Sequence, residues 1–383
     1  MRWATRLLHT GHEMDPATGA LSVPVYQVSS FHQFSPGQEQ EYDYSRSGNP
    51  TRKALEETMA DLEGGGHGFA FASGMAAISS VLCLFSQGDH IIAGEDIYGG
   101  TYRVLTRLFP RFGFDVSFVD TADLEKLTAA FYPHTRAVYL ETPSNPLMRI
   151  TDLRAVAELA HARGALVVVD NTVMTPYFQR PLELGADIVV HSATKYLAGH
   201  SDVIAGVAVV REAGLARELG FIQNAFGAVL GPQDSWLVLR GAKTLKVRME
   251  QHQTGAMAVA AWLAGRPEVE EVYYPGLSSH PGHELHFSQA SGASGLLSFR
   301  LVTAESAQQV LARSRLPFRA VSLGSVESLI SMPARMSHAS LAEEHRHRLG
   351  IDSRLLRYSV GLEEPEDIIA DLEAALRGED RGR

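Results

Sequence analysis

The stretch HSATKYLAGHSD, residues 191–202, places one lysine, Lys195, directly after the apolar segment GADIVV. Lysine is seldom buried, so Lys195 is either a solvated loop cation or a side chain that takes part in a reaction. A lysine amine that is desolvated, or that lies near another cation, loses its proton more easily and can form a Schiff base with a carbonyl compound. The neighbouring hydroxyls of Ser192 and Thr194 can donate hydrogen bonds to an anion.

Two further groups stand at the ends of apolar runs. Ser73, Gly74 and Met75 open a predicted helix, whose free N–H groups and dipole attract anions, although these are also ordinary turn residues. Asp170 ends the run ALVVVD, where a carboxylate is costly unless a cation or donors meet it; the alternative is a cap on the next turn. An anion site, a lysine and a carboxylate match the phosphate, aldehyde and ring nitrogen of pyridoxal 5′-phosphate.

The elements that must position these groups are short apolar runs without clean alternation, typical of strands buried on both faces. They are residues 68–73, 90–94, 115–120, 137–141, 165–170, 187–192 and 203–210. Amphipathic segments separate them; in one, Thr151 is the expected N-cap. This alternation favours an α/β fold with a large, mostly parallel sheet. Ligands of such sheets gather at the carboxyl ends of strands, where Tyr98, Asn145, Asp170 and Lys195 stand.

The texture of the chain predicts three parts. Residues 1–45 are irregular and form an N-terminal arm, residues 46–240 form the large cofactor-binding domain, and residues 241–383 form a smaller C-terminal α/β domain. Near the second boundary a long helical pattern contains Gly241, which predicts a break between two helices.

Composition excludes several classes of protein. The 383 residues carry a net charge of -10, which argues against nucleic acid as a partner. No apolar run approaches the roughly 18 residues of a membrane span, and the start of the chain lacks the apolar core of a secretory signal. The single cysteine, Cys83, allows no internal disulfide and is either core packing or a reactive thiol. We therefore expect a cytoplasmic protein that binds neither nucleic acid nor a membrane.

Two other kinds of site find little support. A dinucleotide-binding protein needs Gly-x-Gly-x-x-Gly after its first strand, and EGGGHGFAF lacks that pattern. The histidines of SHPGHELH, and His338, His345 and His347, are conceivable zinc ligands, but no cysteine ligand joins them and Pro281 with Gly282 indicates a turn. We expect no metal.

Longer motifs carry a resemblance. YSRSGNPTR (44–52), FASGMAA (71–77), YGGTYR (98–103), ETPSNP (141–146), HSATKYLAGHSD and RYSVGLE (357–363) occur in this order. Over nearly its whole length the chain resembles the Cys/Met-metabolism family of pyridoxal-phosphate enzymes, which includes cystathionine γ-synthase, cystathionine γ-lyase and methionine γ-lyase. The resemblance implies the aspartate-aminotransferase-like fold (fold type I). It also implies a homotetramer, a dimer of dimers whose active sites are shared across the dimer.

The resemblance also implies roles for individual residues. Lys195 bonds covalently to the cofactor and moves the substrate's Cα proton, Asp170 faces the ring nitrogen, and Tyr98 stacks on the ring and serves as the acid–base partner. The residues that hold the phosphate are Gly74, Met75, Ser192 and Thr194, with Tyr44 and Arg46 reaching in from the partner subunit. The substrate carboxylate is bound by Arg357, helped by Asn145 and Ser322. A non-catalytic relative would be expected to have lost Lys195 or Tyr98, and both are present.

The substrate's distal end is less well defined. Cystathionine-handling relatives often carry an acidic residue directly before the serine that corresponds to Ser322. This chain has Val321 at that position, which favours the uncharged thioether of methionine. Methionine γ-lyases typically carry a cysteine where this chain has Gly100. Arg103 resembles the cystathionine-type enzymes, and Asp43 is an acidic residue directly before Tyr44. Arg103 is either a contact for a second substrate carboxylate or part of a structural ion pair. We predict γ-elimination on L-methionine or L-cystathionine, giving 2-oxobutanoate, ammonia and a thiol; the alternative is γ-replacement on an O-acylhomoserine.

Overall fold

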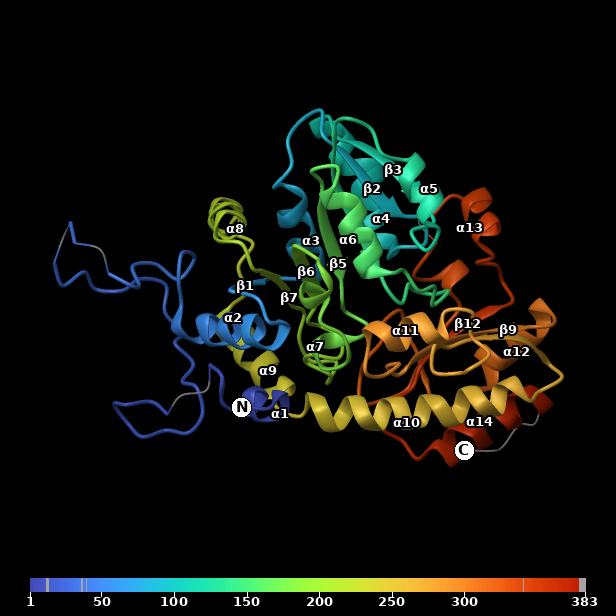
Figure 1. Ribbon diagram of the computed structural model, residues 1–383. Helices are drawn as coiled ribbons and strands as arrows, with labels where there is room; N and C mark the ends of the chain where they lie inside the picture. The colour runs from blue at the N-terminus through green and yellow to red at the C-terminus, as the bar shows by residue number, and fades with distance from the viewer. Residues whose placement is uncertain (12–13, 36, 39, 340, 379–383) are drawn as a thin grey trace.

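The computed structural model describes residues 1–11, 14–35, 37–38, 40–339 and 341–378, and it contains two β-sheets (Figure 1). The larger sheet has the strand order β1-β7-β6-β5-β4-β2-β3, and the smaller one β10-β11-β12-β9-β8. The strands of the larger sheet are β1 (His67–Phe71), β2 (His90–Gly94), β3 (Asp115–Val119), β4 (Thr135–Glu141), β5 (Leu166–Asp170), β6 (Ile188–Ser192) and β7 (Gly206–Val210). Those of the smaller sheet are β8 (Val269–Tyr273), β9 (Leu296–Leu301), β10 (Phe318–Arg319), β11 (Leu329–Ser331) and β12 (Leu355–Ser359).

The larger sheet is mostly parallel, as predicted, with β7 as the exception. β7 runs antiparallel to both of its neighbours, β1 and β6. The segment 193–205, which returns from β6 to β7, contains no helix, and Thr194 fastens it: the Ala205 N–H donates to Thr194 Oγ1 at 3.0 Å. Because Ala205 is engaged in this way, β7 begins at Gly206 and not at the predicted residue 203. The loop that carries Lys195 is thereby tied to the sheet.

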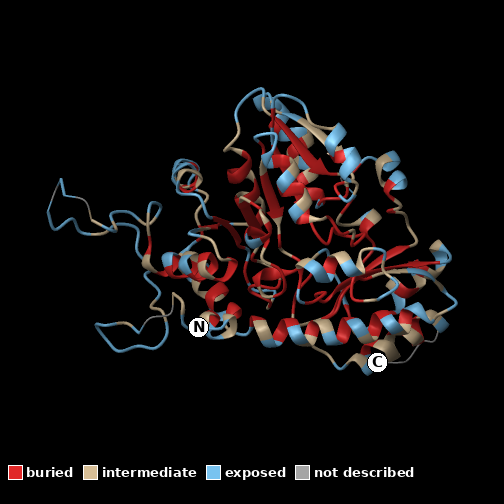
Figure 2. Ribbon diagram, in the orientation of Figure 1, coloured by how far each residue is buried: buried red, intermediate tan, exposed pale blue. Residues whose placement is uncertain are grey.

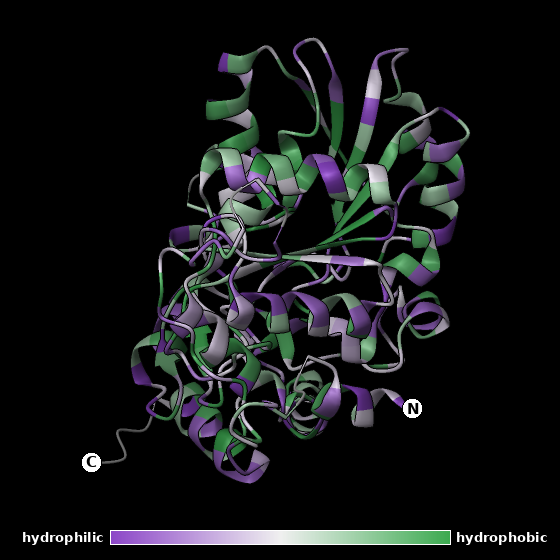
Figure 3. Cartoon of the chain, turned by 90° about the vertical axis from the view of Figure 1, so that its left-hand side faces the viewer, coloured by the Kyte–Doolittle hydropathy of each residue, from purple (hydrophilic) through white to green (hydrophobic). Residues whose placement is uncertain are grey.

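Consecutive strand residues are apolar because each face of the larger sheet has its own core. On β5, Val167 and Val169 belong to one buried cluster, while Val168 between them belongs to the cluster on the other face. Figure 2 shows the central strands of the larger sheet mostly buried, and Figure 3 shows them largely hydrophobic, whereas β3 at the edge is half-buried. A third cluster lies at the smaller sheet and includes Phe299 and Leu356.

Helices cover both faces of the larger sheet and one face of the smaller one (Figure 1). Those up to residue 184 are α1 (Trp3–His9), α2 (Pro50–Glu63), α3 (Gly74–Leu82), α4 (Gly99–Arg103), the π-helix η1 (Val104–Leu108), η2 (Phe109–Phe112), α5 (Leu124–Ala129), α6 (Leu153–His161), α7 (Thr175–Phe178) and η3 (Pro181–Leu184). The later ones are α8 (Ala213–Phe226), α9 (Pro232–Ala242), α10 (Leu245–Ala264), α11 (His283–Gln289), α12 (Ala304–Arg313), η4 (Pro333–Arg335), α13 (Glu343–Leu349) and α14 (Pro365–Arg377).

The predicted cap of α6 is wrong by one residue. Asp152, not Thr151, is the N-cap, and its carboxylate accepts the Ala155 N–H at 3.0 Å. The Thr151 hydroxyl is engaged elsewhere, in a hydrogen bond of 2.8 Å with the hydroxyl of Thr121. Both residue types are good caps, and this tertiary contact decides between them.

The long helical pattern after residue 231 is broken as expected near Gly241, because α9 ends at Ala242 and α10 begins at Leu245. α10 spans both parts of the molecule: Met249 belongs to a core cluster of the larger sheet, and Val259 to the cluster of the smaller sheet. The domain boundaries at residues 45 and 240 stay a prediction. Within the described ranges, no helix combines the length and the apolar character needed to cross a membrane.

Candidate active site

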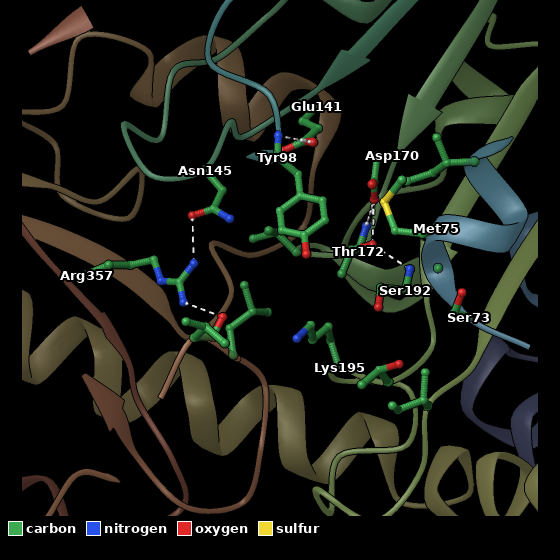
Figure 4. A pocket seen from close by; sticks show the side chains of 17 residues that line it. Ser73, Met75, Tyr98, Glu141, Asn145, Asp170, Thr172, Ser192, Lys195 and Arg357 are labelled. Carbon is green, nitrogen blue, oxygen red and sulfur yellow. Dashed lines mark hydrogen bonds between the residues drawn. The ribbon is translucent and has the colours of Figure 1, made fainter. Parts of the chain in front are cut away.

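The carboxyl ends of the larger sheet's strands, together with β12 and the segment before β11, surround a cavity of about 250 Å³ (Figure 4). Lys195, Tyr98 and Arg357 point into it from different sides. Most of the predicted site residues line this cavity: Gly74, Met75, Tyr98, Asn145, Asp170, Ser192, Thr194, Lys195, Val321 and Arg357. The fold therefore brings together, at one cavity, predicted residues that lie far apart along the chain.

The first turn of α3 forms one wall of the cavity. The Ser73 side chain caps the helix by accepting the Ala76 N–H at 3.0 Å, and Gly74 and Met75 follow it at the cavity. The first N–H groups of a helix have no partner within the helix, so this wall attracts an anion. Gly74 must be glycine here, because a Cβ would lie 2.8 Å from the Ser192 Cβ. The cradle thus joins the start of α3 closely to the end of β6.

Asp170, at the end of β5, lies at the cavity wall. Its Oδ1 accepts the Thr172 N–H at 3.0 Å and the Thr172 hydroxyl at 2.5 Å, and its Oδ2 accepts the Tyr139 hydroxyl at 3.4 Å. Desolvation raises the pKa of the Asp170 carboxyl, while the hydrogen bonds from Thr172 oppose that rise. No lysine or arginine of the described residues forms an ion pair with Asp170. Among the described residues the carboxylate is therefore held by donors without a lysine or arginine partner, and the charge of His191 also lowers its pKa.

Lys195 follows β6, and its amine faces the interior of the cavity. The Nζ atom donates to the Ser322 hydroxyl at 2.7 Å. Desolvation foremost, and then the charge of Arg357, lower the pKa of Lys195 to about 8. The neutral amine that a nucleophile or base needs is therefore well populated near pH 8.

Arg357, on β12, is a buried cation at the opposite wall, 2 % exposed. Its Nη1 donates to Asn145 Oδ1 at 3.1 Å, and its Nη2 donates to the Ser322 carbonyl at 2.8 Å. Burial lowers the pKa of the Arg357 guanidinium to about 10, and among the described residues no carboxylate pairs with it. A buried guanidinium with only neutral partners is suited to bind a ligand carboxylate. His338, one of the candidate zinc ligands, instead donates from Nε2 to the Asn145 carbonyl at 3.0 Å.

Four predicted residues do not line the cavity of this chain: Tyr44, Arg46, Arg103 and Ser322, although the Ser322 hydroxyl accepts the hydrogen bond from Lys195. Tyr44 and Arg46 lie close to each other before α2, with the Arg46 guanidinium carbon 5.4 Å from the Tyr44 ring centroid, and Arg46 Nε donates to Asn224. Arg103 is exposed at the end of α4. The expectation that the first two reach a partner's site, and the role of Arg103, stay predictions.

Several lining residues escaped the sequence reasoning: Ile78, Glu141, Thr172, Val173, Ile204 and Leu323. Glu141 had a readable signal, because it ends the predicted strand AVYLE as Asp170 ends ALVVVD. Its Oε1 accepts the N–H of Tyr98 at 2.8 Å. Thr172 had none, since its hydroxyl matters only through its contacts with Asp170 and with the Ser192 N–H, which it accepts at 2.8 Å.

The residues present fit pyridoxal 5′-phosphate. The cradle between Gly74 and Ser192, which a Cβ would fill, suits the phosphate. Asp170 has no lysine or arginine partner among the described residues, and the protonated ring nitrogen would supply a cation beside it. Lys195 offers an amine of lowered pKa for the aldehyde. Among the described residues no group of three or more His, Cys, Asp or Glu side chains is placed to hold a metal ion.

A lysine, a carboxylate and an anion cradle on a fold of type I define a pyridoxal-phosphate-dependent enzyme. The profile of the Cys/Met metabolism PLP-dependent enzymes matches residues 4–377, and the chain belongs to this family. Its homologues include lyases, and it is a PLP-dependent lyase of Cys/Met metabolism. A small amino acid is the kind of substrate expected for this family.

Named relatives are closely similar. The cystathionine gamma-lyase of Bacillus subtilis (strain 168) is 52% identical over 376 residues, covering 98% of this chain and 99% of the relative. The cystathionine beta-lyase of Lactococcus lactis subsp. cremoris (strain MG1363) is 52% identical over 372 residues, covering 97% and 98%. The crystal structure of cystathionine gamma-lyase from Lactobacillus plantarum complexed with L-serine has a TM-score of 0.97 and 46% identity, covering 99% of both chains. The crystal structure of metB from Corynebacterium glutamicum has a TM-score of 0.96 and 42% identity, covering 98% of both chains.

Proposed function

We propose that the chain is a carbon–sulfur γ-lyase that acts on L-cystathionine, with L-methionine as the other γ-elimination substrate. Water and L-cystathionine would give L-cysteine, 2-oxobutanoate and ammonia; L-methionine would give methanethiol in place of cysteine. The observation that carries the proposal is the placement of the Arg357 guanidinium, whose partners among the described residues are neutral, across one cavity from the Lys195 amine. An α-amino acid whose carboxylate meets Arg357 presents its Cα to Lys195.

The chain's own residues would divide the work as follows. Arg357 and Asn145 bind the substrate carboxylate and fix its orientation. Lys195 takes the proton from Cα, and because γ-elimination removes a second proton from Cβ, a base on a long flexible stem suits both steps. When bound, pyridoxal phosphate supplies the attachment for the substrate amine and the sink for the electrons left at Cα. Asp170 would hold the ring nitrogen in its protonated state.

Tyr98 would act as the acid for the leaving group. It precedes α4, its backbone is fixed by Glu141, and its side chain, 40% exposed, reaches into the cavity (Figure 4). A phenol there can donate a proton to the departing sulfur. Its ring also offers a flat apolar surface on which an aromatic ring can stack.

The distal end of the substrate separates the two γ-elimination substrates. Val321, 59% exposed, and Ile204, 66% exposed, line the cavity and offer no charge, which favours the methyl thioether of methionine. The relatives with about 52% identity are named for cystathionine, which favours the larger substrate. We give cystathionine precedence because those relatives match this chain over nearly its whole length.

A second candidate is β-elimination on L-cystathionine, which gives homocysteine, pyruvate and ammonia. It is supported by cystathionine beta-lyases that are as similar to this chain as the gamma-lyase, at 52% identity. γ-Replacement on an O-acylhomoserine, with cysteine as the incoming thiol, is the remaining alternative from the sequence.

Product analysis separates all of these reactions. The purified holoenzyme is incubated separately with L-cystathionine, with L-methionine, and with O-succinylhomoserine plus L-cysteine, and the 2-oxo acid and thiol are identified by mass spectrometry. The proposal expects 2-oxobutanoate and cysteine from cystathionine. Pyruvate and homocysteine would assign β-elimination, and turnover of the acylhomoserine pair alone, giving cystathionine, would overturn the γ-lyase proposal.

A further inference from the structure

Two carboxyl groups, Glu141 and Asp170, stand side by side at the cavity. Glu141 ends β4 and Asp170 ends β5, and the two residues are paired in the register of these adjacent parallel strands. Such strands lie about 4.8 Å apart, so the two side chains enter one narrow space. Both line the same cavity (Figure 4). Among the described residues, neither forms an ion pair with a lysine or arginine.

The surroundings of the two groups are unequal. Asp170 accepts hydrogen bonds from the Thr172 backbone, the Thr172 hydroxyl and the Tyr139 hydroxyl. Glu141, 7% exposed, accepts the Tyr98 N–H at 2.8 Å, and among the described residues no side-chain hydroxyl donates to it. Donors stabilise the ionised form, and two adjacent carboxyls in a desolvated site do not both ionise readily. The donors, together with the charge of His191, therefore favour the ionised form at Asp170 over that at Glu141.

The other charged and titratable groups near Glu141 do not reverse this order. Asp96, in the segment between β2 and α4, is a further buried acid that adds repulsion, and Tyr139 shares the strand of Glu141. Lys195 and Arg357 lie at other walls of the cavity and bond to Ser322 and Asn145. Desolvation foremost, and then the charge of Asp170, hold the pKa of Glu141 well above its usual range.

We propose that Glu141 is a positioning residue that carries a proton while Asp170 is ionised. In this form its carbonyl oxygen accepts the Tyr98 N–H and fixes the tyrosine at the mouth of the cavity, and it adds no second negative charge beside the cofactor ring. A second carboxylate would favour the charged form of the Lys195 amine and so oppose its use as a base. The inference rests on the proposed pairing of Asp170 with the ring nitrogen, and it is independent of which sulfur amino acid is cleaved.

The matched variants are Glu141→Gln and Asp170→Asn, which make the same neutral, nearly isosteric change at two neighbouring positions. If Glu141 is already neutral, Glu141→Gln keeps the cofactor Kd within about twofold of wild type and leaves the pH midpoint of the cofactor's visible absorbance in place. Asp170→Asn weakens cofactor binding by at least about tenfold and shifts the pH midpoint of the absorbance. Glu141→Ala, which loses the hydrogen bond to the Tyr98 N–H, weakens cofactor binding by about 2- to 10-fold.

These measurements need no substrate, so they stay informative if the γ-lyase proposal fails. An equal loss in Glu141→Gln and Asp170→Asn would overturn the inference, as would a cofactor Kd of Glu141→Ala equal to that of wild type. If Asp170→Asn binds the cofactor normally, the pairing of Asp170 with the ring is wrong. Infrared spectroscopy gives a direct readout: the wild-type protein shows a protonated carboxyl band at pH 7 that Glu141→Gln lacks. Absence of that band in wild type overturns the inference even if a variant fails to fold.

Discussion

Substitution of Arg357 by lysine tests how the substrate carboxylate is bound. The guanidinium is buried, bonds to Asn145 Oδ1 and the Ser322 carbonyl, and has no carboxylate partner among the described residues. Lysine keeps the charge but lacks the planar fork, so about one charge-assisted hydrogen bond to the substrate is lost. Such a bond contributes about 1.5–3 kcal/mol. We therefore expect kcat/KM to fall by about 10- to 150-fold.

The assay compares two substrates with each enzyme. One is the amino acid that gives the highest turnover, and the other is its analogue in which hydrogen replaces the α-carboxylate. Wild type and R357K should process the analogue with similar kcat/KM, within about threefold, because the missing interaction is already absent. An equal loss with both substrates would mean that Arg357 acts only by holding Asn145 and the neighbouring loop, and it would refute the assignment of Arg357 to the carboxylate.

Four further outcomes are expected. Because burial lowers the pKa of Lys195 to about 8, its reaction with an amine-specific reagent in the cofactor-free protein should have a midpoint near pH 8, and a midpoint near that of an exposed lysine would contradict the desolvation. The unfolded chain holds that proton up to about pH 10.4, so the stability of the cofactor-free protein should rise between pH 8 and about 10.4, and chemical denaturation should show that K195M lacks this rise. Gly74→Ala, whose Cβ would lie 2.8 Å from the facing serine, should raise the cofactor Kd about tenfold, whereas Gly231→Ala, with nothing within 4 Å, should leave it unchanged in the same titration. Thr172→Val removes a hydroxyl donor to Asp170, which should raise the pKa of that carboxyl and weaken cofactor binding by about 2- to 10-fold, and an unchanged Kd would show that the hydroxyl is dispensable.

The strands and their order along the chain were predictable from the sequence because both faces of the larger sheet are buried. The run from Val167 to Val169 is apolar at every position since alternate residues serve different cores. The rule that ligands gather where parallel strands end then selected Asp170, and Lys195 just after its strand. Applied to every strand, the same rule would have selected Glu141, which ends β4.

Other features depend on contacts that the sequence does not display. Thr151 and Asp152 are both residue types that cap helices, and the hydrogen bond between Thr151 and Thr121, which the sequence does not display, favours Asp152 as the cap. β7 runs antiparallel because the chain turns back after the lysine loop without a helix. The environment of Tyr44 in an assembly depends on a second copy of the chain and stays a prediction.

The central claim is that the amine of Lys195 forms the covalent bond to pyridoxal phosphate. Treating the holoenzyme with borohydride reduces that bond to a stable one, and proteolysis with mass spectrometry then locates the adduct. We expect the cofactor mass on the peptide that contains Lys195, and none in a Lys195→Arg variant treated in parallel. Finding the adduct on another lysine, or on no residue of a holoenzyme that turns over substrate, would contradict the account.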